Sequence, residues 1–102
     1  MKKIFLILNL LLIPVAVKAQ NQDMVFKNCT QFSLLAEEVM RARQGGESLS
    51  GFIESVHHNE MLTYLAMAAY RKPLFRSEPY KNITISEFRD TAFMACMSRK
   101  KL

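Results

Sequence analysis

The chain contains two cysteines, Cys29 and Cys96, and the bond that they can form constrains the fold more than any other feature of the sequence. An even number of cysteines in a small exported chain is typical of a disulfide, and two cysteines allow one intramolecular pair. That bond closes a loop over most of the predicted domain, which corresponds to about 4 kcal/mol of stability on the chain-entropy model. The alternative is a pair of free thiols for redox or metal chemistry, although the chain has no C-x-x-C motif.

Residues 1–19 predict that the chain is exported, which is the condition for a disulfide to persist. Met1–Lys3 is a short basic segment, residues 4–15 are mostly apolar, and Val17 and Ala19 are small side chains at the positions that signal peptidases read. The apolar run is too short for a membrane span, which needs about 20 residues. We therefore expect a cleaved signal peptide over residues 1–19 and a mature domain over residues 20–102, in the periplasm or secreted, with no membrane span.

The basic character of the sequence comes largely from the expected signal peptide. The whole chain has 14 basic and 9 acidic side chains and a net charge of +5. Without Lys2, Lys3 and Lys18 the net charge is +2, and no concentrated basic stripe remains of the kind that nucleic-acid binding requires. The last basic run, Arg99–Lys101, is typical of a solvated tail after a helix, with a phosphate- or lipid-binding tail as the alternative. We expect no nucleic-acid partner.

Apolar residues at three- and four-residue spacing predict two helices in the first half of the domain. The first covers residues 24–43 and ends at Gly45–Gly46. Its expected inward stripe consists of Val25, Cys29, Phe32, Ala36, Val39 and Met40. Ser48 can cap a second, shorter helix, which ends near His57–His58.

A third helix is predicted over residues 60–70, with Asn59 as its cap. This segment is apolar over most of its circumference, so we expect it to be buried centrally. Pro73 and Pro79 then bracket residues 72–82, which predicts that this stretch is the longest irregular segment of the domain.

The fourth helix is predicted to begin at Thr84. Thr84 and Glu87 have the spacing of a capping box, and Ile83 and Phe88 have the spacing of a hydrophobic staple. From that start, helical periodicity turns Cys96 inward, toward the first helix. The whole pattern predicts an all-α fold, a small bundle of about four helices stapled by one disulfide, in which the third helix lies between the first and the last.

Two stretches of the sequence carry a family resemblance. Residues 40–50 form one of them, and the second contains Ala69, Tyr70, Pro73, Phe75, Ser77, Glu78, Tyr80, Lys81, Glu87 and Phe88. Together they resemble a family of small exported proteins of Gram-negative bacteria and their phages or prophages. The family pattern includes a cysteine before the first stretch and another near the C-terminus, matched by Cys29 and Cys96. The resemblance implies a periplasmic, one-disulfide helical domain, and it implies no catalytic residue.

Metal chemistry would have to pass through His57 and His58, the only histidines of the chain. Adjacent helical side chains point about 100° apart, so the two imidazoles cannot chelate one ion from a regular helix. A polar junction between two helices is the favoured interpretation. Met94 and Met97 share a helix face, and with either histidine they would form soft ligands for Cu(I), although methionines at helical spacing are more often core residues. The sequence therefore predicts no metal and no other cofactor.

Enzymatic activity is not expected from this sequence. Both cysteines are expected to be oxidised, no serine lies in a G-x-S-x-G turn, and a domain of this size rarely provides a cleft for an acid–base pair. The pair Glu37 and Glu38 is adjacent in sequence and therefore lies on different helix faces.

The best candidate for a functional surface is the segment from Tyr70 to Tyr80. Tyr70, Arg71, Phe75, Arg76 and Tyr80 bring together aromatic and arginine side chains, which dominate the energetics of protein interfaces. The alternative is that the aromatic rings of this segment fold back to close the core. We therefore expect a non-enzymatic interaction protein of the inhibitor, immunity or exclusion type that binds a protein partner. A periplasmic stress chaperone with a methionine-rich surface and a small-ligand or copper binder are the alternatives, and the sequence predicts no oligomeric state.

Overall fold

The structure is a computed structural model that describes residues 24–102, so the expected signal peptide over residues 1–19 lies outside the described residues. The described part is all-helical and contains no strand. A helix of residues 24–44, called the N-terminal helix below, precedes α2 (Leu49–Ser55), α3 (Glu60–Ala69) and α4 (Glu78–Ser98). Within residues 24–102, no helix combines the length and the hydropathy that a membrane crossing requires.

The predicted ends of the first three helices are confirmed, because their caps form as the sequence indicates. Gly46 lies in the left-handed region with φ of 87° and allows the N-terminal helix to end in a turn closed by backbone hydrogen bonds. The Ser48 hydroxyl accepts a hydrogen bond from the Gly51 N–H at 3.1 Å, which caps α2. Asn59 Oδ1 accepts one from the Leu62 N–H at 3.0 Å, which caps α3.

The predicted start of the fourth helix at Thr84 is wrong, because α4 begins two turns earlier, at Glu78. Ser77 is its N-cap and accepts a hydrogen bond from the Tyr80 N–H at 3.4 Å. Pro79 lies in the first turn, where its missing N–H breaks no helical hydrogen bond, so it starts the helix that it was expected to prevent. The irregular segment is therefore residues 70–77 and not residues 72–82, and Thr84 lies within the helix.

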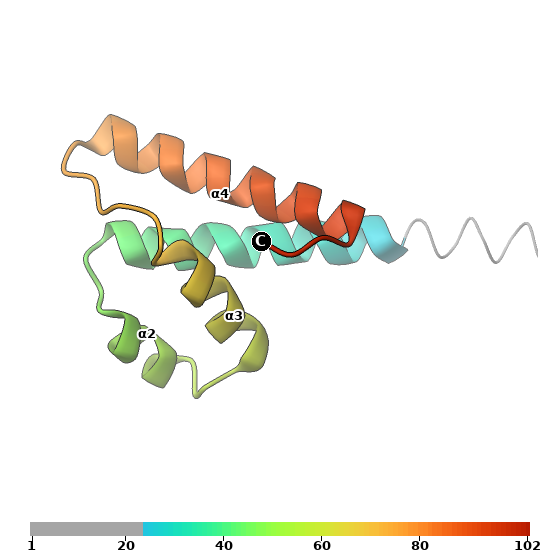
Figure 1. The fold of residues 1–102 in the computed structure, drawn as a ribbon, viewed down its shortest axis with the longest axis horizontal. Coiled ribbons are helices and arrows are strands. Elements are labelled where there is room, and N and C mark those ends of the chain that lie inside the picture. Colours follow the sequence, from blue (N-terminus) through green and yellow to red (C-terminus); the bar gives the residue numbers. More distant parts are fainter. Residues whose placement is uncertain (1–23) are drawn as a thin grey trace, which may run out of the picture.

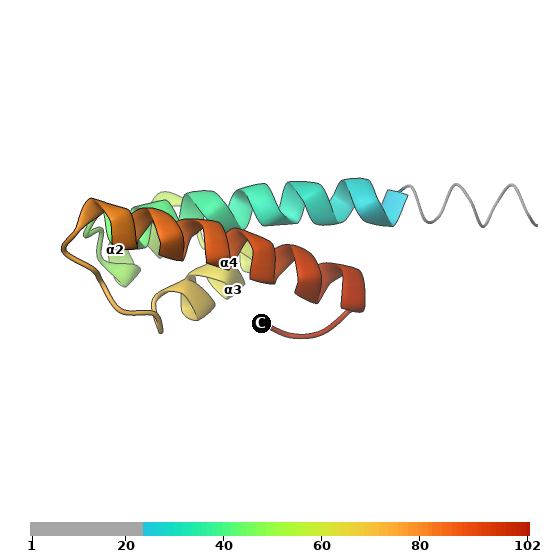
Figure 2. The ribbon, with the colours of Figure 1, turned by 90° about the horizontal axis from the view of Figure 1, so that it is seen from above.

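The N-terminal helix and α4 lie side by side and antiparallel, as Figures 1 and 2 show. A disulfide between Cys29 and Cys96, with Cα atoms 5.5 Å apart, joins the start of one to the end of the other across a sequence separation of 67. At the same end the ring of Phe26 meets that of Phe93 edge-on, with centroids 5.8 Å apart. The predicted pairing of the cysteines and of the first and last helices is thus confirmed.

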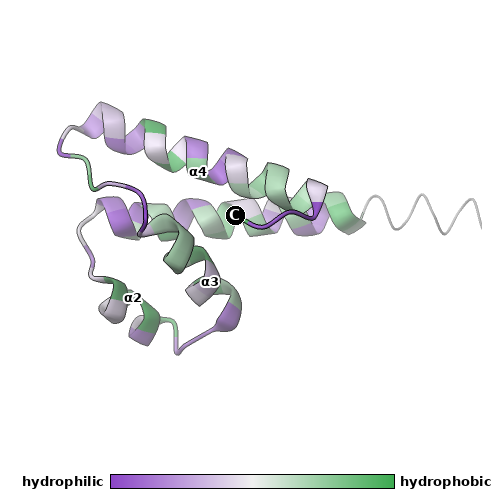
Figure 3. Cartoon of the chain, in the orientation of Figure 1, coloured by the Kyte–Doolittle hydropathy of each residue, from purple (hydrophilic) through white to green (hydrophobic). Residues whose placement is uncertain are grey.

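The core lies where all four helices meet. The sequence predicted that α3 is buried centrally, but only one side of α3 is enclosed in the core. Figure 1 shows α2 and α3 packed on one side of the antiparallel pair. The buried apolar side chains are Ala36, Val39, Met40, Phe52, Leu65, Ala66, Ala68, Ala69, Ile85, Phe88 and Ala92. Since α2 has only seven residues, it leaves part of α3 uncovered, and Met61, Tyr64 and Met67 are 49%, 39% and 53% exposed. Figure 3 shows that most of α3 has the green of hydrophobic residues, so its apolar residues include both buried and exposed ones.

The turn between α2 and α3 places His57 and His58 in the left-handed region, with φ of 54° and 57°. The N–H of His57 bonds to the Glu54 carbonyl and that of His58 bonds to the Ile53 carbonyl, both at 3.0 Å. These two bonds form a Schellman motif at the end of α2. The same motif, with Gly46 in the place of His57, closes the N-terminal helix. A non-glycine residue in this conformation costs roughly 1–2 kcal/mol.

Replacing His57 by glycine is therefore expected to stabilise the protein. The relief of backbone strain exceeds the entropy that glycine adds to the unfolded chain, which leaves a gain of about 0.5–1 kcal/mol and a rise of a few degrees in Tm. The matched control is Gly46→Ala, where a Cβ would meet no atom within 4 Å, so only the backbone conformation opposes it. Thermal unfolding should move in opposite directions for the two variants; a lower Tm for His57→Gly would contradict the strain at this turn.

Candidate functional site

The residues between α3 and α4, here called the strap (residues 70–77), are held by a buried glutamine at the end of the N-terminal helix. Gln44 is only 2% exposed. Its Nε2 donates to the Pro73 carbonyl at 2.8 Å, and its Oε1 accepts from the Phe75 N–H at 3.0 Å. The Lys81 ammonium group, from the first turns of α4, donates to the Gln44 backbone carbonyl. One side chain thus fixes two backbone groups of the strap.

Arg43 and Tyr70 form a second attachment at the start of the strap. Arg43 Nε and Nη2 donate to the Lys72 carbonyl at 3.2 and 3.1 Å, and the guanidinium carbon lies 5.2 Å from the centroid of the Tyr70 ring. The Tyr70 hydroxyl donates to the Glu47 carbonyl at 2.8 Å. Burial and the nearby Glu47 carboxylate raise the pKa of Tyr70, which Arg43 lowers in part, so the hydroxyl stays a donor. Tyr70, predicted as a partner-binding residue, therefore has a structural role.

The other predicted partner-binding residues divide between the two sides of the strap. Phe75 is half-buried, and its ring lies 5.9 Å from that of Tyr80, with an interplanar angle of 33°. Tyr80 is 62% exposed on the first turn of α4, and Arg76, four positions earlier in the strap, is also exposed. The alternative in which the rings fold back onto the core therefore holds in part for Phe75 and fails for Tyr80. Phe75, Arg76 and Tyr80 are called the outer surface below.

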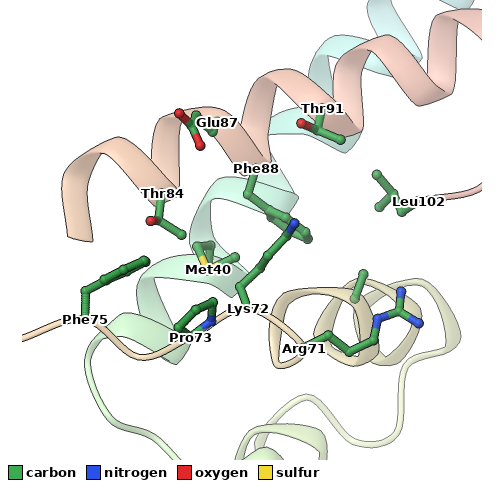
Figure 4. Close-up of a pocket in the computed structure, with 11 residues that line it drawn as sticks. Met40, Arg71, Lys72, Pro73, Phe75, Thr84, Glu87, Phe88, Thr91 and Leu102 are labelled. Carbon is green, nitrogen blue, oxygen red and sulfur yellow. The ribbon is translucent and has the colours of Figure 1, made fainter. Parts of the chain in front are cut away.

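A cavity of about 280 Å³ lies on the other side of the strap, between α3, α4 and the N-terminal helix. Figure 4 shows Met40 at its base, with Pro73 and Phe75 on the strap side and Phe88 on the α4 side. Ala68 of α3 completes the apolar lining. Gln44 attaches the strap to the N-terminal helix, and α3 and α4 diverge on the other side of the strap (Figure 1).

Polar and charged side chains form the rim of this cavity. Arg71 and Lys72 line it from the strap, and Thr84, Glu87 and Thr91 line it from α4; Figure 4 shows the Lys72 side chain extending toward Phe88. No ion pair of Arg71 or Lys72 is present among residues 24–102. Two cationic side chains and one acidic side chain therefore surround an apolar base.

The tail after α4 folds back toward the cavity. The Leu102 N–H donates to the Tyr64 hydroxyl at 2.8 Å, and the Leu102 side chain packs against the core and lines the cavity. Figure 1 shows this tail passing from the end of α4 toward α3. Arg99, Lys100 and Lys101 are exposed along it, where they continue the basic run seen in the sequence.

The histidines and methionines considered as metal ligands are not brought together. His57 and His58 are exposed in the turn between α2 and α3, whereas Met94 and Met97 are 66% and 43% exposed near the end of α4. Figure 1 shows these two regions on different parts of the molecule. Among residues 24–102, no group of three or more His, Cys, Asp or Glu side chains is placed to hold a metal ion.

Gln44 and Arg43 are the site residues that the sequence did not indicate. Both follow the expected stripe of the N-terminal helix and contact residues about 29 positions away, so no local pattern reveals their partners. The available signal was Gln44 itself, a polar residue four positions after the buried Met40 and therefore on the inward face. No protein-family model, curated protein or solved structure matches this chain.

Proposed function

We propose that the chain is an exported, non-enzymatic interaction protein that binds a protein partner through the outer surface, as an inhibitor, immunity or exclusion module in the periplasm. The observation that carries the proposal is the 62% exposure of Tyr80 on a backbone that is fixed on both sides. A tyrosine and an arginine in this setting have the composition of an interface hot spot. The disulfide supports an oxidising compartment.

The attachment of the strap favours binding because it lowers the entropic cost of forming an interface. Gln44 fixes the carbonyl of Pro73 and the N–H of Phe75, and Arg43 fixes the carbonyl of Lys72. The backbone between the outer surface and the core is therefore ordered before a partner arrives. Preorganised loops bind more tightly for the same contacts, since less conformational entropy is lost.

The combined substitution Arg76→Ala, Tyr80→Ala is expected to abolish partner binding with little change in Tm. Both side chains are exposed, and neither makes a side-chain hydrogen bond that holds residues 24–102 together. The measurement is affinity capture by the oxidised protein from periplasmic extract, followed by titration of the captured partner against both forms. Truncation of one hot-spot residue typically costs at least about 2 kcal/mol of binding free energy.

The matched control for that experiment is Met94→Ala, which truncates a side chain of similar exposure at the other end of α4. It should bind the partner as the unmodified protein does. Equal loss of binding in both variants, or a large fall in the Tm of the Arg76→Ala, Tyr80→Ala variant, would assign these residues to general stability instead of recognition.

The exposed methionines favour a second proposal, a periplasmic chaperone for unfolded chains. Met61 and Met67 on α3 and Met94 and Met97 on α4 are between 43% and 66% exposed. Flexible methionine side chains adapt to many apolar partners. This function predicts capture of a broad set of unfolded proteins that survives the Arg76→Ala, Tyr80→Ala substitution, and its loss in a variant with polar residues at Met61 and Met67.

A further inference from the structure

The cavity behind the strap and the outer surface are separate features of the same segment. Arg76 and Tyr80 do not line the cavity, whereas Arg71 and Lys72 do. Phe75 contributes to both, with its ring against Tyr80 on one side and toward the cavity on the other. A ligand in the cavity would therefore contact Arg71 and Lys72, whereas a partner on the outer surface would contact Arg76 and Tyr80. Substitutions at these two pairs distinguish the two kinds of binding.

We propose that this cavity binds a small monocarboxylic acid with an aliphatic body. The apolar surface that stays accessible in the cavity comes from Pro73, Phe75 and Leu102, above the buried Met40 and Phe88, so an alkyl chain placed there leaves water. Removal of apolar surface from water is the main driving force for such a ligand. The side chains at the base offer no strong hydrogen-bonding group, which excludes a sugar or another polar ligand from this part of the cavity.

The charge of the rim selects an anionic head group. Arg71 and Lys72 lie on the strap side and have no ion-pair partner among residues 24–102, while Glu87 is the one acidic side chain of the lining. An arginine side chain can hold a carboxylate by two parallel hydrogen bonds. An ammonium head group would meet two like charges and one opposite charge, so a monoanion fits the rim better than a cation.

The volume of the cavity sets the length of the ligand. A water molecule takes about 30 Å³ in the liquid, so a cavity of about 280 Å³ holds on the order of ten non-hydrogen atoms. An eight-carbon acid is therefore a probe of suitable size. The Leu102 side chain at the edge of the cavity shows that an aliphatic group fits against this lining.

Octanoate is the probe that tests the proposal, at concentrations below those at which it forms micelles. The oxidised protein should bind one octanoate in a calorimetric titration, and octylammonium should bind at least threefold more weakly. The methyl NMR signal of Met40 should shift as octanoate is added. The methyl signal of Met94, which lies outside the lining and is 66% exposed, should remain unchanged.

Arg71→Gln and Lys72→Gln should each weaken octanoate binding by about threefold, as expected for partly exposed ion pairs. Both side chains are exposed, so the variants retain the fold, and the Lys72 carbonyl still accepts from Arg43. The matched control is Arg76→Gln, which removes the same charge from the same strap outside the cavity. Octanoate affinity should not change in this variant.

Three results would overturn the proposal: no binding of octanoate at millimolar concentration, a Met94 shift as large as that of Met40, or an equal loss of affinity in Arg76→Gln. The first excludes the ligand class, and the other two indicate nonspecific attraction to the surface. Capture of the protein partner is measured separately and depends on Arg76 and Tyr80. Either proposal can therefore fail while the other stands.

Discussion

Replacement of both Cys29 and Cys96 by alanine is expected to lower the free energy of unfolding by about 4 kcal/mol, the largest effect of any change described here. The bond closes a loop with a sequence separation of 67, so its loss releases much conformational entropy in the unfolded chain. A domain of this size has a total stability of only roughly 4–12 kcal/mol. Urea unfolding of the oxidised protein and of the variant measures the difference.

The reduced form of the unmodified protein separates the two contributions to that loss. Cys29 is 1% exposed, so alanine at this position also removes a buried sulfur atom from the core. Reduction breaks the bond and leaves both sulfur atoms in place. The reduced protein should therefore lose most, but not all, of the stability that the double alanine variant loses. Coincident urea midpoints for the oxidised and reduced proteins would refute the loop-closure argument.

Gln44→Leu is expected to be the most destabilising single substitution at a polar side chain, with a loss of about 3 kcal/mol. The leucine leaves the Pro73 carbonyl and the Phe75 N–H without their partner, and each unpaired buried group costs roughly 1–3 kcal/mol. Thermal and urea unfolding measure the loss, and Gln31→Leu on the exposed face of the same helix is the control. Equal effects at positions 31 and 44 would show that the strap is not held by this side chain.

The stability of a Gln44→Glu variant is expected to depend on pH. The carboxylate can still accept from Phe75 but cannot donate to Pro73, and burial favours its neutral form. The pKa of this carboxyl group in the folded state is then raised above its value in the unfolded state. Its protonated form is therefore fully compatible with the fold at acidic pH, and stability is lost as the pH rises through the raised pKa. The unmodified protein has no such transition from this position.

Local signals in the sequence were sufficient for most of the secondary structure. Gly45–Gly46, Ser48 and Asn59 lie where the backbone needs a left-handed residue or a side-chain acceptor, and each acts within three residues of its own position. The pairing of Cys29 with Cys96 needed no distance information, because only one intramolecular pair is possible.

The start of α4 was predicted wrongly because two cap signals compete within eight residues. Thr84 and Glu87 have capping-box spacing, but Ser77 followed by Pro79 is an equally valid start. Both starts place Ile85 and Phe88 within the helix, where they are buried, so burial of these residues does not distinguish the two starts. Once α4 begins at Glu78, the side chain of Ile83 is 50% exposed and forms no staple. Local capping signals alone do not determine which of two possible N-termini a helix uses.

The cavity and the attachments of the strap could not be predicted from the sequence, because they depend on contacts between distant residues. Gln44 acts on positions about 30 residues later, and the space behind the strap exists only when α3 and α4 diverge. The exposure of Met61 and Met67 has a similar origin, since it depends on how little of α3 the short α2 covers. Periodicity shows that a helix is apolar and does not show which neighbours are long enough to cover it.

The two ends of the antiparallel helix pair are secured by different chemistry. The disulfide holds the end at Cys29, whereas at the opposite end Lys81 of α4 donates a hydrogen bond to the Gln44 carbonyl and the Gln44 side chain holds the strap (Figure 1). A change in the redox state of the surroundings breaks a bond at the first end alone, although the loss of stability is shared by the whole domain. Reduction therefore removes the covalent link at the end of the pair that lies far from Tyr80, and in reduced protein that remains folded the strap keeps its hydrogen bonds to Gln44.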